Sequence, residues 1–130
     1  MLASAVQAAS RRVSASSHYA ALVAGGVADA RTERVVEAGG AYVPGHPVVV
    51  RIRARGRRLD LDDRGAAVAL AGRPRGWFTA ADRVVAESGM NVNRAGVVFV
   101  SAVAGRDVDK LARRLGETSR AVYIELLELD

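Results

Sequence analysis

The chain contains no cysteine and only two histidines, His18 and His46, among its 130 residues. The lack of cysteine excludes disulfide bonds, thiolate zinc sites and thiol nucleophiles. The two histidines are far apart in the sequence, so a histidine-rich metal site is not predicted either. Lysine is nearly absent as well: Lys110 is the only one, whereas the chain has 18 arginines. The candidate chemistry therefore rests on arginines, carboxylates and a few aromatic rings.

Motifs that position a nucleophile or a phosphate are also missing. There is no G-x-S-x-G nucleophile elbow, and the paired glycines at 25–26 and 39–40 lack the spacing of a phosphate loop or a dinucleotide fingerprint. No apolar run approaches the roughly 20 residues that a bilayer-spanning helix needs. Residues 10–13 loosely resemble a twin-arginine signal, but Ser14 interrupts the apolar part. The sequence predicts a cytoplasmic protein with no cofactor and no membrane partner.

The net charge of the chain is +5, and it is unevenly distributed. Half of the residues are apolar, which suffices for 130 residues to bury one core, so we expect a single domain over residues 1–130. Residues 48–80 carry eight Arg and three Asp, whereas residues 1–47 sum to +1 and residues 81–130 to −1. The whole basic excess lies in the middle of the chain, where it would attract a polyanion.

The first 36 residues predict a helical segment that docks loosely on the rest of the domain. Residues 2–25 place small apolar side chains near a helical spacing. Asp29 could cap a further short helix that ends at Gly39–Gly40. The core of the domain is then expected over residues 41–130.

A turn is predicted at residues 42–47, and from Val48 the apolar pattern alternates with a period of two, as in a β-strand. With Gly56–Arg57 as a type II′ turn, two strands form a hairpin. The predicted pairs are Arg55–Arg58, Ala54–Leu59, Arg53–Asp60, Ile52–Leu61 and Arg51–Asp62. Each pair of opposite charges that face each other across two strands contributes roughly 0.2–1 kcal/mol. Most of these charged side chains are therefore expected to form a row of solvent-exposed cross-strand pairs, a charge ladder. The tip of the hairpin, Arg55, Arg57 and Arg58, is left uncompensated.

Two helices are predicted after this hairpin. Asp62 or Asp63 could cap the first, a short alanine-rich helix that Gly72 would end. Residues 79–88 predict the second helix, whose first residues, T-x-x-D, resemble a capping box.

A second hairpin is predicted from residues 90–93 and 97–103, around the turn NRAG. Its second strand is apolar on both faces and is therefore expected to be central or well covered. The last helix, which begins near Asp107, carries an apolar stripe: Val108, Leu111, Ala112, Leu115, Ser119, Val122 and Leu126. Its final turns add Tyr123, Ile124 and Leu127, for which two interpretations stay open, burial in the domain or contact in a homodimer.

These elements together predict an α+β fold. Two antiparallel hairpins form a small sheet, the middle and C-terminal helices cover it, and a helix precedes it at the N-terminus.

The first hairpin and the helix after it resemble a family of bacterial and phage domains that has no assigned activity. In that family a β-hairpin ends in a leucine, one or two aspartates and a glycine, and leads into a short helix. The matching residues are Leu61, Asp62, Asp63 and Gly65, with Gly45 in the preceding turn. The resemblance covers about residues 37–127 and implies the same fold, but no activity.

The leading functional hypothesis is a non-enzymatic binding or regulatory module for an anionic partner, either nucleic acid or an acidic protein. The loop RPRGWF carries the only tryptophan as a possible stacking surface. The predicted contact residues are Arg55, Arg57, Arg58, Arg64, Arg73, Arg75 and Trp77. The arginine content itself has two open explanations: a GC-rich genome, or selection for planar donors that bind phosphate or carboxylate in bidentate fashion.

Two other classes of function compete with this hypothesis. Asp60 and Asp62 share a strand face, and with Asp63 they could belong to a small metal-dependent enzyme, although no further oxygen ligand lies nearby in the sequence. The third class is a structural homodimer built on the C-terminal helix. The enzyme hypothesis requires the three carboxylates to converge.

Overall fold

The computed structural model describes residues 33–129, which form a five-stranded antiparallel sheet and three α-helices. The helix predicted over 2–25 and the signal-like residues 10–13 lie outside the described residues. The strands are β1 (Glu33–Val43), β2 (His46–Arg55), β3 (Arg58–Asp62), β4 (Asn91–Val92) and β5 (Val98–Val103), in the sheet order β1-β2-β3-β5-β4. The helices are α2 (Ala66–Leu70), α3 (Trp77–Glu87) and α4 (Val108–Leu127), the last preceded by the 3₁₀ turn η1 (Gly105–Asp107).

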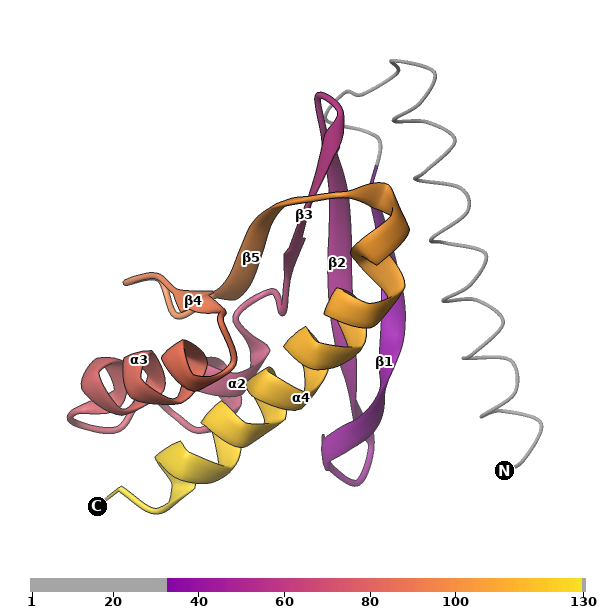
Figure 1. Cartoon of the computed structure of the whole chain (residues 1–130). Helices are drawn as coiled ribbons and strands as arrows, with labels where there is room; N and C mark the ends of the chain where they lie inside the picture. The colour runs from indigo at the N-terminus through magenta and orange to yellow at the C-terminus, as the bar shows by residue number, and fades with distance from the viewer. Residues whose placement is uncertain (1–32, 130) are drawn as a thin grey trace.

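The predicted α+β class is therefore confirmed. Helix α4 lies across one face of the sheet, and α2 and α3 pack against it toward the β4 end (Figure 1). Within residues 33–129 no helix combines the length and the apolar character that crossing a membrane requires.

Residues 33–43 form the edge strand β1, so the short helix predicted up to Gly39–Gly40, and with it the helical assignment of residues 33–36, is wrong. Val36 faces Val50 of β2, and together with Ala38 it is buried under α4. The glycine pair does not end a helix. Gly39 and Gly40 have φ of 95° and 78°, and the β1–β2 register shifts between Glu37 and Ala41, which is the geometry of a β-bulge.

The turn predicted at residues 42–47 is shorter than expected. Only Pro44 and Gly45 lie between β1 and β2. A type II turn requires a positive φ at its second central position, where Gly45 has a φ of 87°, and it commonly has proline at the first, as here. The flanking residues extend the two strands into a long hairpin.

The predicted β2–β3 hairpin is confirmed with its register. The strands pair Arg51–Asp62, Ile52–Leu61, Arg53–Asp60, Ala54–Leu59 and Arg55–Arg58. Gly56 has a φ of 61°, as the first central position of a type II′ turn requires. The apolar members of these pairs face the core and the charged members face away from it, as the period of two predicts.

Helices α2 and α3 both follow a glycine in the left-handed conformation, Gly65 with φ of 76° and Gly76 with φ of 82°. Helix α3 has no side-chain cap, so the predicted T-x-x-D capping box is wrong. At the start of α2 the N-cap residue is Gly65, and the carboxylate of Asp63 accepts from the backbone N–H groups of Gly65 and Ala67, whereas Asp62 accepts from the N–H of Arg64, before the helix. Helix α3 begins at Trp77, two residues earlier than predicted, and Gly72 follows the end of α2 as expected.

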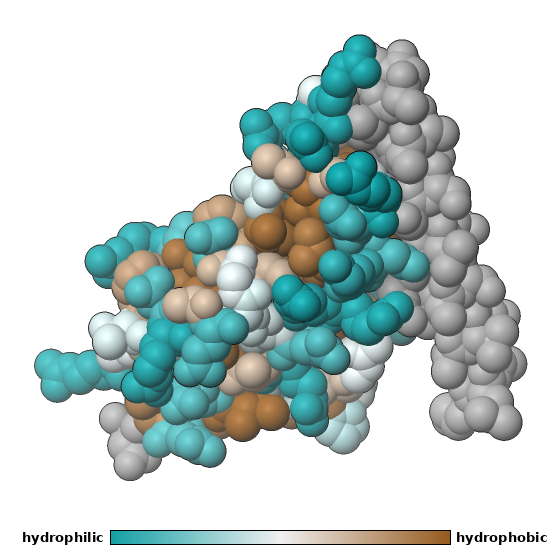
Figure 2. Space-filling view, in the orientation of Figure 1, coloured by the Kyte–Doolittle hydropathy of each residue, from teal (hydrophilic) through white to brown (hydrophobic). Residues whose placement is uncertain are grey.

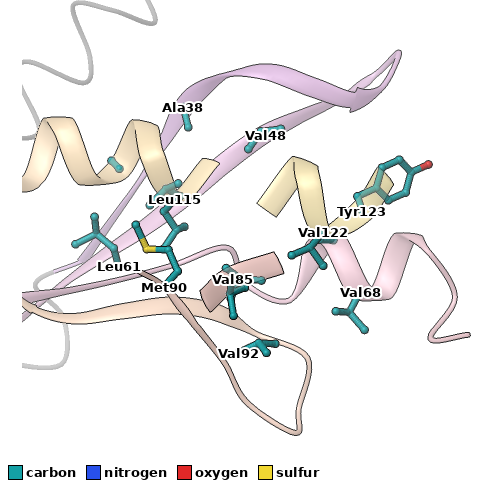
Figure 3. Packing of buried hydrophobic residues seen from close by; sticks show 14 of the residues in the cluster. Ala38, Val48, Leu61, Val68, Val85, Met90, Val92, Leu115, Val122 and Tyr123 are labelled. Carbon is teal, nitrogen blue, oxygen red and sulfur yellow. The ribbon is translucent and has the colours of Figure 1, made fainter. Parts of the chain in front are cut away.

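The core lies between the sheet and the three helices, and α4 contributes the most residues to it (Figure 3). The predicted α4 stripe is confirmed, since Val108, Ala112, Leu115, Ser119, Val122 and Leu126 are buried and Leu111 is half-buried. Strand β5 pairs with both β3 and β4, as its apolar sequence predicts, although Ser101 and Ala102 in it are exposed. Gly116 marks the closest approach of α4 to the sheet: a Cβ there would overlap the Cβ of Ala38 and lie 3.3 Å from Val48 Cγ1.

Candidate functional site

The face of the β2–β3 hairpin that points away from the core carries the charge ladder. The carboxylate of Asp62 is nearly buried and accepts from Nε of Arg51 at 3.2 and 3.1 Å. Arg53 reaches the same carboxylate diagonally, with Nη2 3.5 Å from Oδ2. The predicted Arg51–Asp62 pair is thus confirmed, whereas the ion pair of Arg53 is with Asp62, and its interaction with the directly opposite Asp60 is Coulombic only.

Arg55 is also paired, which corrects the prediction that it is uncompensated. Its Nε and Nη2 donate to the two carboxylate oxygens of Asp60 at 2.6 and 3.1 Å. Diagonal neighbours on adjacent strands lie within reach of long side chains, and the shifted pairing follows from this reach. The hydrogen bond from Arg55 holds the pKa of Asp60 below its usual range. The backbone N–H of Ala102, which donates to Oδ1 of Asp60 at 3.0 Å, lowers this pKa further.

The tip of the hairpin retains two arginines that make no ion pair within residues 33–129. Arg57 and Arg58 are both exposed. They lie at the far end of the β2–β3 hairpin, at the top of Figure 1, where the surface is hydrophilic (Figure 2). Free guanidinium groups at a protruding tip can approach an anion without breaking an internal salt bridge.

Asp63 points to the opposite side of the sheet from Asp60 and Asp62. It is fully buried, and its Oδ1 accepts from the backbone N–H of Gly65 at 2.8 Å and of Val98 at 3.0 Å. Its Oδ2 accepts from Ser119 Oγ of α4 at 2.6 Å. Since the three carboxylates do not converge, they cannot share one ion, and no group of three or more metal-ligating side chains occurs in the described part of the chain.

The contacts of Asp63, which directly follows β3, form a buried polar network that joins the end of β3 to β1, β5 and α4. Ser119 Oγ lies 2.6 Å from Tyr42 Oη; because Ser119 donates to Asp63, the tyrosine hydroxyl donates to Ser119. Burial raises the pKa of Tyr42 to about 12, and it raises the pKa of Asp63 despite the hydrogen bonds that favour the charged form. This network ties the sheet to α4 and is structural.

A second group of arginines lies against two aromatic rings at the start of α3. The Cζ of Arg73 lies 5.0 Å from the ring centroid of Trp77, and the Cζ of Arg94 lies 3.9 Å from that of Phe78. The two rings meet edge to face, with centroids 5.4 Å apart and planes at 86°. We call Arg73, Trp77, Phe78 and Arg94 the arginine–aromatic cluster.

Half of this cluster was not predicted from the sequence. Trp77 and Arg73 were candidate contact residues, but Phe78 and Arg94 were not. Arg94 belongs to the turn between β4 and β5 and is distant from Phe78 in the sequence, so only the packing of that turn against α3 brings them together. Arg64 and Arg75, the remaining candidates, are exposed, and Arg64 has an unusual φ of 61°.

The structure therefore divides the predicted site into two parts. The hairpin tip and the start of α3 lie at different ends of the molecule (Figure 1). A shallow pocket of about 260 Å³ occupies the sheet face outside the core, between the hairpin and the β4–β5 turn. Its lining residues are Arg51, Arg53, Asp60, Leu61, Asp62, Asn93, Val97, Phe99 and Ser101.

A larger hollow of about 710 Å³ lies where the C-terminal end of α3 meets α4. Its lining residues are Glu87, Ser88, Gly89, Arg114, Glu117, Thr118 and Ala121. None of them belongs to the hairpin tip or to the arginine–aromatic cluster, so this hollow is separate from both.

The three residues proposed for a dimer contact do not share one environment. Tyr123 is 7% exposed and meets the ring of Tyr42 edge-on at 5.6 Å, so it belongs to the core. Ile124 and Leu127 are 43% and 55% exposed. A homodimer stays a prediction, and it would have to use the latter two residues.

Comparison of the chain with known protein families, curated proteins and solved structures found no match. The resemblance to the hairpin–helix family therefore stays a prediction.

Proposed function

We propose that this domain is a binding module for an anionic macromolecule and that Arg57 and Arg58 make its first contact. The observation that carries the proposal is the difference among the hairpin arginines. Arg51, Arg53 and Arg55 are engaged by Asp62 and Asp60, whereas the two tip residues are exposed and make no ion pair within residues 33–129.

The physical basis is the geometry of the guanidinium group. Its planar fork can donate two hydrogen bonds to one phosphate or carboxylate, and such charge-assisted bonds are about twice as strong as neutral ones. The two adjacent tip residues carry two such forks on a narrow turn, while the paired arginines behind them keep the hairpin in register. The hairpin thus supplies both a rigid support and two exposed guanidinium groups with which to bind a polyanion.

Replacing both tip residues, Arg57→Ala with Arg58→Ala, should reduce the salt dependence of binding to nucleic acid. Each phosphate contact contributes about 0.7 to 0.9 to the slope of log K against log[salt], so the slope should fall by roughly 1.4 to 1.8. The measurement is a series of binding isotherms between about 50 and 200 mM salt.

The matched control is Arg113→Ala with Arg114→Ala, which removes an adjacent exposed pair from α4. This control changes the net charge by the same amount and should leave the slope close to that of the unmodified protein. An unchanged slope in the tip variant would refute the assigned contact.

A further inference from the structure

We infer that the anionic macromolecule is a single-stranded nucleic acid whose unstacked bases stack on the arginine–aromatic cluster. This inference rests on the proposed function, since it names the partner of the same module and gives it a second contact.

The cluster presents planar groups in fixed positions. The guanidinium of Arg94 lies over Phe78 with only 3.9 Å between Cζ and the ring centroid, and Arg73 lies over Trp77 at 5.0 Å. Both arginines are exposed and both rings are half-buried. Nucleobases stack on aromatic rings and on guanidinium planes, and a guanidinium in a stack still directs its N–H groups outward toward phosphate.

The turn that carries Arg94 is braced before any partner binds. Asn93 Oδ1 accepts from the backbone N–H groups of Ala95 and Val97, both at 3.0 Å. The guanidinium of Arg73 donates to the carbonyl oxygen of Ala95, which connects the loop before α3 to the same turn. A surface that is already ordered loses little conformational entropy on binding, so stacking energy is retained as affinity.

Single strands fit this arrangement better than the alternatives. The carboxylates of an acidic protein would pair with the guanidinium charges but have no flat ring to stack on the exposed faces of Arg73 and Arg94, and in a duplex the base faces are already covered by one another. The spacing of the two sites also favours an extended chain. The five residues of β3 alone separate the tip from the other end of the sheet by about 17 Å.

The pocket of about 260 Å³ lies between the two sites and offers an intermediate contact. Phe99 and Ser101 of β5 and Asn93 of the braced turn line it, opposite the partly exposed Arg53. A nucleic-acid strand that runs from the tip to the cluster, over the sheet face that the helices of residues 33–129 leave uncovered, would pass this pocket.

The test compares three labelled probes at equal salt: a mixed-sequence single strand of about 12 nucleotides, a size within the range of single-strand binding sites, a duplex of the same sequence, and polyglutamate. Trp77 is the only tryptophan, so its fluorescence reports on the cluster directly. We expect the single strand to bind at least about tenfold more tightly than the other two probes and to change the Trp77 emission.

Arg94→Lys is the decisive variant because it keeps the charge and removes the planar group. It should weaken binding of the single strand about fivefold or more and leave polyglutamate binding unchanged. Arg113→Lys on α4 is the control and should change neither. Equal affinity for the three probes, with no Trp77 signal and no effect of Arg94→Lys, overturns this inference and leaves the tip contact standing. A preference for polyglutamate overturns it in favour of an acidic protein, and no binding to any probe at low salt overturns both proposals.

Discussion

An Asp63→Ala variant is expected to lose about 3–5 kcal/mol of unfolding free energy, the largest effect that we predict for one substitution. Alanine would leave the N–H groups of Gly65 and Val98 and the hydroxyl of Ser119 without their acceptor in a buried site. Each orphaned donor costs about 1–3 kcal/mol when water cannot replace the partner. Urea unfolding followed by circular dichroism measures the loss.

Asp63→Asn is the matched control, because the amide oxygen can still accept from both backbone N–H groups. It should cost much less than Asp63→Ala. If the alanine and asparagine variants were equally stable, the hydrogen-bond network could not be the source of the effect.

The unmodified protein and the Asp63→Asn variant should also differ in how their unfolding free energy depends on pH. Burial raises the pKa of Asp63 in the folded state, so the folded protein holds this proton at pH values where the unfolded chain has released it. Stability from this group is therefore highest below its unfolded pKa of about 4 and falls as the pH rises toward the folded pKa. Asp63→Asn should lack this fall; identical pH profiles from unfolding titrations would contradict it.

Gly116→Ala should destabilise the protein by about 1–2 kcal/mol, although alanine is the better helix former. Alanine in a helix gains about 1 kcal/mol over glycine, but overpacking a tight contact costs about 1–3 kcal/mol or more. The added methyl group would overlap the Cβ of Ala38 and crowd Val48, and neither atom is the end of a flexible side chain. Thermal unfolding measures the net effect.

The compensating change is Ala38→Gly, which removes the atom that the new methyl group meets. The double variant Ala38→Gly with Gly116→Ala should be more stable than the sum of the two single changes predicts. Strict additivity would mean that α4 and β1 do not contact each other in this way.

The parts of the fold that were predicted correctly depend on local periodicity. The β2–β3 register follows from alternation around Gly56, and α4 follows from its apolar stripe. Strand β1 was missed because Gly39–Gly40 has the composition of a helix end, while the evidence for a strand is its pairing with β2. Pairing between strands is a tertiary property, and it overrides weak local preference.

The candidate site was predicted less well, for two different reasons. The separation of Asp63 from Asp62 was available in the sequence: Asp62 is the last residue of β3, and because successive residues of a strand point to opposite faces, the residue that follows it is expected on the other side. The contact of Arg94 with Phe78 was not available, since it depends on how the β4–β5 turn packs against α3. Likewise, alternation places Arg55 on the same face as Asp60 but does not choose between its direct and diagonal partners.

The bulge at Gly39–Gly40 bears on how this protein behaves at high concentration. A sheet margin with a long, regular row of backbone donors and acceptors recruits strands from other molecules and seeds fibres. At one margin β4 contributes two residues, and at the other the bulge divides β1, so that its regular part begins with the charged Glu33 and Arg34. Within residues 33–129 neither margin offers an incoming strand a long uninterrupted template, and this part of the sheet therefore disfavours fibre growth through its edges.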